Sequence, residues 1–470
     1  MSRKNKKTVI ESIRLGNYAA EGKTIAHTED GKALFVEGGV PGDVVRVLVH
    51  KSKKSYSEGK VLELLEPSPN RTEPFCAHFG ICGGCKWQML PYELQLQYKQ
   101  QQVADQLSRI GHLELPEISP IKGSGRTRYY RNKLEFTFSQ QQYLTREEIA
   151  ASEGAEIARQ PALGFHAPGM FDKVVDIETC HLQEEPTNRI KNYLRAEAFR
   201  LDLPFYDYRK HEGWLRNLII RVASTGQVMV NLVVQHYREE LPLLLDGILE
   251  IAPEVTSLHY TLNDKLNDSI YDRDIVCYYG TPYIEEHLEH FRFKISPKSF
   301  FQTNTEQAAE LYRVTRDFAG LTGSEVVYDL YCGTGSIGIF CSEKAGSIIG
   351  IELVEDAILD ARINAEWNNL DKCHYFTGDV GKIVTNDFYK KYGKPDVVIT
   401  DPPRAGMSEK LIEQLLQMRA PRIVYVSCNP ATQARDLALL TDMYQVKKIQ
   451  PVDMFPHTHH IENVVLLELK

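Results

Sequence analysis

The chain has 470 residues, of which 43% are hydrophobic and 25% charged, the proportions of a globular protein with two or three domains rather than a disordered one. Residues 1–7 are charged and no apolar stretch follows them. Neither a signal peptide nor a membrane span is expected, so the protein is predicted to be cytoplasmic. The net charge of −8 argues against contact with nucleic acid over the whole surface, but residues 1–72 carry 13 Lys and Arg against nine Asp and Glu. This basic segment suits local contact with RNA, and an ordinary solvated surface equally well.

Short runs of β-branched residues, separated by Gly-Gly and Pro-Gly turns, fill residues 8–66. This pattern predicts a small five-stranded, OB-like β-barrel as the first domain, at residues 1–68. One of its loops holds cations and an aromatic ring suited to phosphates and base stacking: Lys51, Lys53, Lys54 and Tyr56. A loop that only aids solubility would have a similar composition.

A β-rich central domain is predicted at residues 69–290. Residues 92–112 have helical periodicity, and this helix is a candidate to pack on the domain that follows. Its apolar face consists of Leu96, Val103, Leu107 and Ile110. Alternating apolar and polar residues predict mostly strands over 127–285, and the polar stretch 140–160 predicts an exposed hairpin or insertion.

From residue 291 onward, short apolar runs alternate with helical segments. The runs are 326–330, 347–352, 396–400 and 422–426. This rhythm predicts a mostly parallel sheet with helices on both faces, so residues 291–470 are expected to form a doubly wound, Rossmann-like α/β domain.

A glycine-rich turn follows the first of these strands, at residues 331–336 (Tyr-Cys-Gly-Thr-Gly-Ser). Glycines let the backbone approach a ligand closely, and Glu352, 17 residues after Gly335, is placed to accept hydrogen bonds from a ribose diol. The turn lacks the GxGxxG pattern of pyrophosphate binders, so S-adenosylmethionine is the favoured cofactor. Asp379 after the next strand suits an adenine amino group. A purely structural glycine turn is the alternative.

The motif at residues 401–404 (Asp-Pro-Pro-Arg) stands at the carboxyl end of another strand, where open α/β sheets bind their ligands. Enzymes that methylate exocyclic amines have an aromatic residue after the prolines, and this chain has Arg404 in that place. The difference argues for another chemistry.

Two short polar segments near the C-terminus contain Cys428 and Glu462, 34 positions apart. A thiol needs nearby positive charge to form the reactive thiolate, and Arg404, His457 and His459 are candidates to provide it. Addition of a thiolate to carbon 6 of uracil makes carbon 5 nucleophilic enough to take a methyl group from a sulfonium. A general base must then remove the proton at carbon 5. Cys428 and Glu462 suit these two roles, whereas a lone buried cysteine is more often structural.

Three cysteines have metal-ligand spacing, Cys76-x5-Cys82-x2-Cys85, and Cys180 is the best candidate for a fourth ligand. Four thiolates suit zinc or an iron–sulfur cluster, and the spacing does not separate these two. The other cysteines are expected to be packing residues: Cys277, Cys332, Cys341 and Cys373.

Taken together, the segments around these motifs resemble the RNA (uracil-5-)-methyltransferase family, and the N-terminal barrel resembles the TRAM domain of RNA-modifying enzymes. The matching segments are 295–304, 331–335, Glu352, 401–406, 427–430 and 459–462. The resemblance implies that six residues surround the cofactor: Gln302, Tyr331, Ser336, Glu352, Asp379 and Asp401. Some members have Asn where this chain has Ser336, so that contact rests on the weakest match.

The resemblance also implies a 4Fe–4S cluster on Cys76, Cys82, Cys85 and Cys180, as in the ribosomal-RNA members, with zinc as the alternative. The predicted product is 5-methyluridine in 23S ribosomal RNA, and the closest alternative is the T-loop uridine of transfer RNA. Two further alternatives are a radical S-adenosylmethionine enzyme and a non-catalytic RNA-binding assembly factor. RNA is the expected partner, and no feature of the sequence requires a protein partner.

Overall fold

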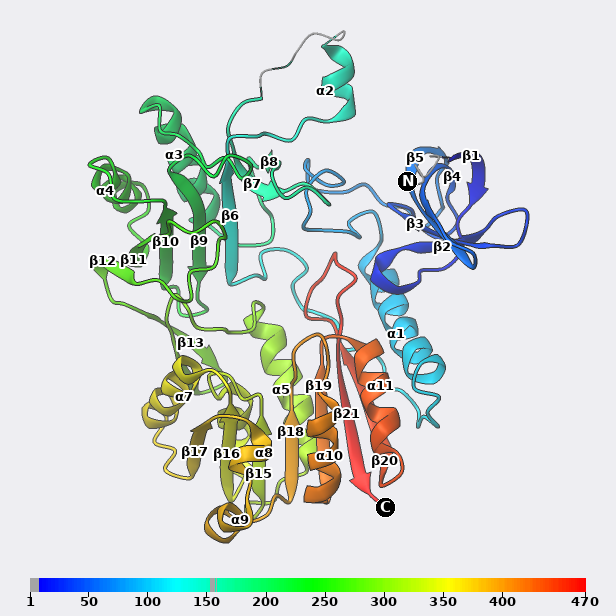
Figure 1. Ribbon diagram of the computed structural model, residues 1–470, viewed down its shortest axis with the longest axis vertical. Helices are drawn as coiled ribbons and strands as arrows, with labels where there is room; N and C mark the ends of the chain where they lie inside the picture. The colour runs from blue at the N-terminus through cyan, green and yellow to red at the C-terminus, as the bar shows by residue number, and fades with distance from the viewer. Residues whose placement is uncertain (1–7, 153–156, 158) are drawn as a thin grey trace.

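The computed structural model describes residues 8–152, 157 and 159–470. It contains a small N-terminal sheet, a central sheet and a C-terminal sheet, linked by a long helix and a short hairpin (Figure 1). The charged residues 1–7 and part of the predicted insertion at 140–160 lie outside the described residues. Among the helices that the structure describes, none combines the length and apolar character needed to cross a membrane.

The first sheet is a five-stranded barrel with the strand order β1-β4-β5-β3-β2. Its strands are β1 (Thr8–Arg14), β2 (Thr24–His27), β3 (Ala33–Glu37), β4 (Val44–Ser52) and β5 (Tyr56–Glu66). A single 3-10 turn, η1 (Ala20–Gly22), joins β1 to β2. Alternate residues of β4, among them Val45 and Val47, point into a small apolar core. The strand number predicted from the Gly-Gly and Pro-Gly turns is confirmed.

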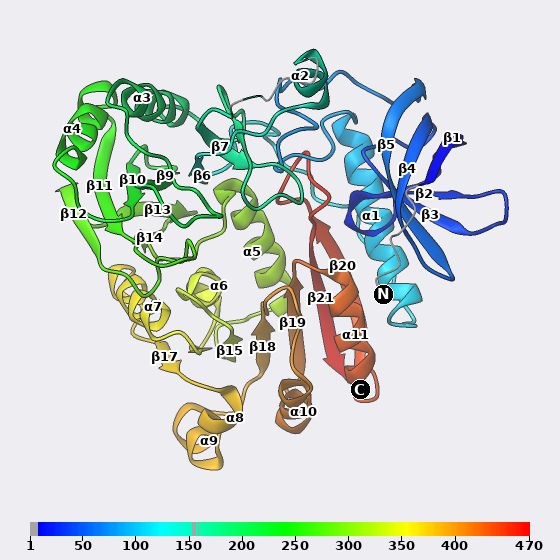
Figure 2. The same cartoon turned by 45° about the horizontal axis from the view of Figure 1, so that its top comes forward.

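Helix α1 (Tyr92–Arg109) lies between the barrel and the C-terminal sheet, as both views show (Figures 1 and 2). Val103 and Leu107 are buried in the same apolar cluster as residues of the C-terminal sheet. Ile110 of the predicted apolar face is instead 48% exposed, because the helix ends at Arg109. On the barrel side, Tyr18 and Val40 pack against Trp87 and Leu90 in a separate cluster.

The central sheet has seven strands in the order β12-β11-β10-β9-β6-β7-β8. They are β6 (Lys133–Ser139), β7 (Ala162–His166), β8 (Val174–Asp176), β9 (Leu215–Val222), β10 (Val228–Val234), β11 (Val255–Leu262) and β12 (Ile275–Gly280). Helices α3 (Thr187–Arg200) and α4 (Leu241–Ile251) pack on it and share its apolar core. The predicted insertion contains helix α2 (Arg146–Ala151), which begins with a capping box on Thr145 rather than a hairpin turn.

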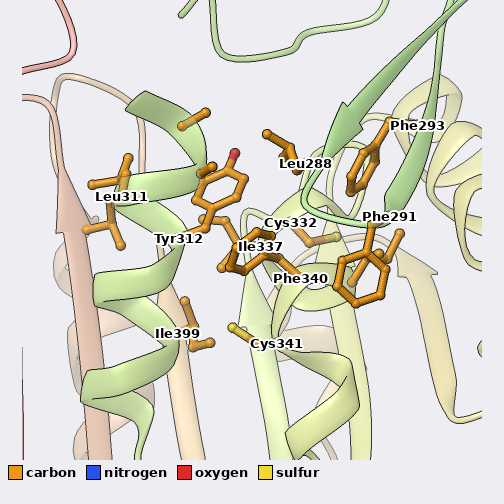
Figure 3. Close-up of a cluster of buried hydrophobic side chains, with 14 of the residues drawn as sticks. Leu288, Phe291, Phe293, Leu311, Tyr312, Cys332, Ile337, Phe340, Cys341 and Ile399 are labelled. Carbon is orange, nitrogen blue, oxygen red and sulfur yellow. The ribbon is translucent and has the colours of Figure 1, made fainter. Parts of the chain in front are cut away.

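A hairpin of β13 (Ile284–Leu288) and β14 (Phe291–Ile295) leads into the C-terminal domain. Its apolar side chains belong to the C-terminal core rather than to the central one. Figure 3 shows Phe291 and Phe293 of this hairpin beside Phe340 and Cys332 of the C-terminal core. The predicted domain boundary at residue 291 therefore falls inside the hairpin.

The C-terminal sheet has the order β17-β16-β15-β18-β19-β21-β20, and only β20 and β21 break its parallel pairing. Its strands are β15 (Val326–Leu330), β16 (Ser347–Glu352), β17 (Cys373–Thr377), β18 (Val397–Thr400), β19 (Arg422–Ser427), β20 (Tyr444–Val452) and β21 (Glu462–Leu469). The helices are α5 (Thr305–Ala319), α6 (Ser336–Cys341), α7 (Glu355–Trp367), α8 (Val380–Ile383), α9 (Asn386–Tyr392), α10 (Glu409–Met418) and α11 (Pro430–Leu440), with a 3-10 turn η2 (Ser342–Lys344). The predicted doubly wound α/β fold is confirmed.

Side chains of each central strand alternate between two apolar layers. Val327 of β15 points into the layer formed with α5, α6 and α7, whereas its neighbour Tyr328 points into the layer formed with α1, α10 and α11. Cys332 and Cys341 are buried in the first layer as predicted, but Cys277 on the edge strand β12 is exposed. The sheet is thus buried on both faces, and the carboxyl ends of its strands are where a ligand is expected to bind.

Candidate active site

The predicted site residues follow the carboxyl ends of five neighbouring parallel strands. They are Tyr331 after β15, Glu352 at the end of β16, Asp379 after β17, Asp401 after β18 and Cys428 after β19. The strand order reverses between β15 and β18, and such a reversal opens a crevice at the carboxyl edge of a doubly wound sheet. The fold therefore brings together residues that span about 100 positions of sequence.

The glycine-rich turn is tied directly to the acidic residue predicted to bind ribose. Gly333 N donates a hydrogen bond to Glu352 Oε2 at 3.2 Å, while Leu353 N donates to Oε1 at 2.7 Å. The backbone of the turn is left-handed at Tyr331 (φ 60°), Gly333 (φ 52°) and Gly335 (φ 78°). At Gly335 a Cβ atom would lie 2.8 Å from Tyr375 Oη, so only glycine fits there.

Two further residues near this turn were not predicted from the sequence as site residues. Asp329 is fully buried, accepts a hydrogen bond from Gly338 N at 2.9 Å through Oδ2, and has no partner for Oδ1 in the described part of the chain. Its burial raises the pKa of this carboxyl to about 7. Tyr312 of α5 shares a hydrogen bond of 2.9 Å with Ser336 Oγ, and Figure 3 shows its hydroxyl at the margin of the apolar cluster. An acid inside an apolar strand marks Asp329 in the sequence, but no local signal marks Tyr312.

Gln302 and Asp379, two more of the predicted cofactor residues, are bonded to elements outside the glycine-rich turn. Gln302 is half-buried, and its carbonyl oxygen accepts a hydrogen bond from Asn132 Nδ2 at 2.9 Å, so the segment before α5 is fastened to the central domain. Asp379 caps α8, accepting from Gly381 N at 3.0 Å, and its Oδ1 lies 3.5 Å from Lys410 Nζ. A ligand would have to share this carboxylate with the helix cap.

The predicted catalytic pair meets across two antiparallel strands. Ser427, the last residue of β19, pairs with Asn463 of β21. Continued by one position, the same register sets Cys428 opposite Glu462, where side chains on paired antiparallel strands lie close together. Asp401 joins them from the neighbouring strand, because β18 pairs with β19 in parallel through Thr400 and Tyr425. A thiol and two carboxyl groups thus share one end of the sheet.

Burial controls the charge state of these groups. Burial, together with the nearby Glu462 and Asp401, raises the pKa of the Cys428 thiol to about 12, whereas Arg404 lowers it. Burial together with the neighbouring Asp401 also raises the pKa of Glu462 well above the usual carboxyl range, and burial raises that of Asp401. At neutral pH without ligands, the thiol and the Glu462 carboxyl are protonated, and Asp401, whose pKa is raised to about 7, is partly protonated.

Only one of the three cations suggested for thiol activation remains. Burial lowers the pKa of His457 to about 4 and that of His459 to about 3, so both rings are neutral at pH 7 and the suggestion is wrong for them. Arg404 is exposed, and no hydrogen bond or salt bridge of its guanidinium is found in the described part of the chain. Its carbonyl oxygen accepts from Asn429 Nδ2 at 3.2 Å, next to the thiol.

The four predicted metal-ligand cysteines line one cavity of about 490 Å³. They are Cys76, Cys82, Cys85 and Cys180. Burial, together with the other thiols of the set, raises the pKa of Cys82 to about 11 and that of Cys180 to about 12. Within residues 8–152, 157 and 159–470, no group of three His, Cys, Asp or Glu side chains is close enough to hold one metal ion.

Comparisons with known proteins agree with this architecture. Residues 273–470 match the model of the family described as tRNA (uracil-5-)-methyltransferase, and residues 14–62 match the TRAM domain. A protein of Bacteroides thetaiotaomicron, named uncharacterized RNA methyltransferase, is 52% identical over 456 residues, covering 96% of this chain and 100% of its own length. A protein of Chlorobaculum tepidum with a similar name is 41% identical over 473 residues, covering 99% and 97%.

Among solved structures, a tRNA (uracil-54, C5)-methyltransferase of Pyrococcus abyssi, in complex with S-adenosyl-L-homocysteine, superposes with a TM-score of 0.73. It is 27% identical, and the match covers 98% of this chain and 100% of that one. The shared fold includes the domains on either side of the carboxyl edge described above. The chain therefore belongs to the tRNA (uracil-5-)-methyltransferase family, as a TRAM-containing, S-adenosylmethionine-dependent RNA methyltransferase.

Proposed function

We propose that this protein methylates carbon 5 of a uridine in RNA through a covalent adduct on Cys428, which Glu462 resolves. The observation that carries the proposal is the pairing of Ser427 with Asn463, the immediate neighbours of Cys428 and Glu462, together with the effect of Glu462 and Asp401 on the pKa of the thiol. This arrangement supports a nucleophile and a base acting on the two ends of one carbon–carbon double bond.

In the first step, the Cys428 thiolate adds to carbon 6 of the uracil, and the electron pair of the double bond moves to carbon 5 and its adjoining carbonyl. Carbon 5 then takes the methyl group. Glu462 as a carboxylate removes the proton that remains on carbon 5. The double bond forms again as the carbon–sulfur bond breaks, and the thiolate leaves. Asp401, at the same edge, is the proposed partner for the uracil ring.

S-adenosylmethionine, when bound, supplies a methyl group on a positively charged sulfur. Six residues are proposed to hold it: Gln302, Tyr331, Ser336, Glu352, Asp379 and Asp401. The unpartnered Oδ1 of buried Asp329 and the open glycine turn support a polar ligand here. Positive charge at the edge also favours the ionised forms of Cys428 and Glu462, which the free protein disfavours.

For the target we propose 23S ribosomal RNA. The support is the set of four cysteines around one cavity, which matches the ribosomal-RNA members in the resemblance drawn from the sequence. Transfer RNA is a second candidate, because the Pyrococcus abyssi protein, whose printed name gives uracil-54 of tRNA, matches this chain along its whole length. An N-terminal barrel therefore does not by itself favour ribosomal RNA.

We further propose that Cys76, Cys82, Cys85 and Cys180 hold a 4Fe–4S cluster. The support is that the four thiols line one cavity of about 490 Å³, in the arrangement that the resemblance to the ribosomal-RNA members implies, and zinc is the alternative. With all four irons ligated by protein, the cluster would supply a structural cross-link rather than an open coordination site. Iron and acid-labile sulfide in stoichiometric amounts, without zinc, are the expected analysis of anaerobically purified protein.

The covalent mechanism is tested with RNA that contains 5-fluorouridine. The wild-type protein is expected to form a stable protein–RNA adduct in the presence of S-adenosylmethionine, because the fluorine at carbon 5 cannot be removed as a proton. Cys428→Ala should form no adduct and transfer no methyl group, and any remaining adduct would refute the nucleophile. With ordinary RNA, Glu462→Gln should accumulate adduct, whereas turnover at the wild-type rate would rule out Glu462 as the base.

The target is tested by transfer of labelled methyl groups to RNA from a strain that lacks this protein, fractionated by size, with Cys428→Ala as the control. Label in 23S RNA is the expected result. Label confined to transfer RNA would support the second candidate, and 5′-deoxyadenosine as a product would contradict the polar mechanism.

A further inference from the structure

Residues 453–461, between β20 and β21, carry the chain directly into Glu462, and we call them the base loop. Figure 1 shows this loop rising from the end of the C-terminal sheet toward the central domain, beside α1. His457, in its middle, has a left-handed backbone (φ 64°), which an isolated chain rarely adopts for a non-glycine residue. The loop is largely buried, so its conformation depends on the elements packed around it.

One buried side chain of α1 contacts the centre of the loop with both ends of its amide. Gln95 is 0% exposed, and its Oε1 accepts a hydrogen bond from His457 N at 2.8 Å. Its Nε2 donates to the carbonyl oxygens of Trp87 and Leu90, both at 3.0 Å, and lies 3.2 Å from His457 Nδ1. Gln95 thus joins α1, the loop and the segment that follows the cysteines.

The segment after Cys85 holds the same residue of the loop from the other side. Lys86 N and Trp87 N both donate to the carbonyl oxygen of His457, at 2.8 and 3.0 Å. The Trp87 ring lies 4.7 Å from that of Tyr18 in the barrel. The middle of the base loop is therefore bonded to the cysteine segment, which the barrel contacts in turn.

A buried ion pair fastens the start of the loop to the same helix. Lys99 Nζ lies 2.6 Å from Asp453 Oδ1, with both side chains 0% exposed, and also donates to the carbonyl oxygen of Phe455 at 3.1 Å. Tyr92 Oη donates to Asp453 Oδ2 at 2.9 Å. Removing one partner of such a pair leaves a buried charge uncompensated, so the pair itself is a poor target for a test.

The nucleophile is held by a different set of contacts. Ser427 Oγ accepts a hydrogen bond from Asn429 N at 3.1 Å, and Asn429 caps α11 through its side chain. No hydrogen bond in the described part of the chain joins these residues to Gln95 or to His457. Glu462 is the first residue of β21 and pairs with Val452, so a change in the base loop is expected to act on Glu462 at the loop end of its strand, while the Cys428 turn keeps its own contacts.

We propose that Gln95 is a positioning residue that fixes the base loop so that Glu462 can remove the proton from carbon 5. This inference rests on the proposed function, and it assigns α1 and the segment after the cysteines to the last chemical step rather than to the attack on uracil. Gln95 touches neither the substrate nor the reacting atoms, so its effect passes through His457 and the loop.

The test separates the two steps in the full-length protein. The rate of adduct formation with 5-fluorouridine RNA reports attack and methyl transfer, while tritium release from RNA labelled at carbon 5 of uridine reports proton removal. In Gln95→Leu, which keeps the side-chain volume and loses all hydrogen bonds of the amide, tritium release should slow about 10-fold. Adduct formation should stay within about 2-fold of the wild type, and ordinary RNA should accumulate adduct.

Gln101→Leu is the matched control, because Gln101 lies on the exposed side of the same helix and its side chain bonds, among the described residues, only to Asp105. It should leave both rates unchanged. Gln95→Glu keeps an acceptor for His457 N but sets a carboxylate against the carbonyl oxygens of Trp87 and Leu90, so it should slow tritium release at least as much as Gln95→Leu. Equal slowing of both rates, or no change in either, in Gln95→Leu and Gln95→Glu would overturn the inference. Failure of the wild-type protein to trap 5-fluorouridine RNA would instead overturn the proposed function.

Discussion

At the scale of single residues, the main property of this site is that burial opposes the ionised forms that the chemistry needs. The pKa of Cys428 is raised to about 12, and the group that lowers it is Arg404. The neutral His457 and His459 cannot take over that role. Among the described residues, Arg404 is therefore the side chain that favours the thiolate, alongside the positive charge of a bound cofactor.

Arg404→Ala should slow adduct formation with 5-fluorouridine RNA by about 10-fold near pH 7, the effect of a rise of about one unit in the pKa of the thiol. Because the thiol pKa lies far above neutral, the rate should increase with pH up to at least pH 9 in both proteins, with the variant slower at each pH. Arg404→Lys keeps the positive charge and should slow adduct formation less than Arg404→Ala. Identical pH profiles for the wild type and Arg404→Ala would contradict this role.

Tyr312 offers a second test at this scale. Tyr312→Phe removes the 2.9 Å hydrogen bond to Ser336 and leaves the ring in its apolar cluster. A lost hydrogen bond of about 1 kcal/mol predicts a KM for S-adenosylmethionine about 5-fold higher, with a small change in kcat. Tyr328→Phe, which removes a hydrogen bond to Gly393 at the opposite end of β15, is the control. An unchanged KM in Tyr312→Phe would place Ser336 outside the cofactor site.

At the scale of elements, the glycine turn and the strand ends make the site. The turn follows β15 because the left-handed backbone at Gly335 lets the chain reverse into α6 while Tyr375 fills the space beneath it. Glu352 reaches the turn because β15 and β16 are hydrogen-bonded neighbours. The element boundaries were readable from the sequence, since apolar runs and glycines mark them, but the contact between Gly333 and Glu352 depends on strand order.

Gly335→Ala should therefore weaken S-adenosylmethionine binding by at least 10-fold and lower the Tm, because the added methyl group meets Tyr375 at 2.8 Å in a left-handed conformation. Gly323→Ala is the control for backbone strain alone, since Gly323 also has a positive φ (110°) but no atom within 4 Å of the new Cβ. Calorimetric titration with the cofactor and thermal melts measure both effects. Equal losses in the two variants would mean that strain, and not the fit of the turn, decides binding.

At the scale of the whole molecule, the barrel, the cysteine segment and α1 meet around the loop that precedes Glu462. Trp87 contacts the barrel through Tyr18 and the base loop through its backbone N–H. The domains are therefore in direct contact and are not joined by linkers alone. We expect RNA contact at the barrel to add affinity, while the carboxyl edge of the C-terminal sheet performs the reaction.

The loop between β4 and β5 is the expected RNA contact of the barrel. Lys53 and Lys54 are exposed, whereas Lys51 forms an ion pair with Glu58 at 2.5 Å. Replacing both Lys53 and Lys54 with Ala should raise the KM for RNA. It should also reduce the slope of log affinity against log salt concentration by about 1 to 2, because each phosphate contact contributes close to one to that slope. The kcat should not change. Lys51→Ala is the control, and an unaltered salt slope in the double variant would exclude this loop from RNA contact.

The sequence alone determined the class of fold and indicated the candidate reactive groups. Apolar runs of strand length, glycine turns and the Asp-Pro-Pro-Arg and Cys-Asn-Pro motifs are local patterns, so they identify the α/β domain and mark Cys428, Glu462 and the glycine turn as candidates without coordinates. The tertiary structure decided what depends on distance. It supplied the register that sets Cys428 opposite Glu462, the burial that raises their pKa values and keeps His457 neutral, and the contact of Gln95 with a loop 362 positions away. Pairing, burial and long-range hydrogen bonds depend on which elements become neighbours, and a local pattern contains no record of that.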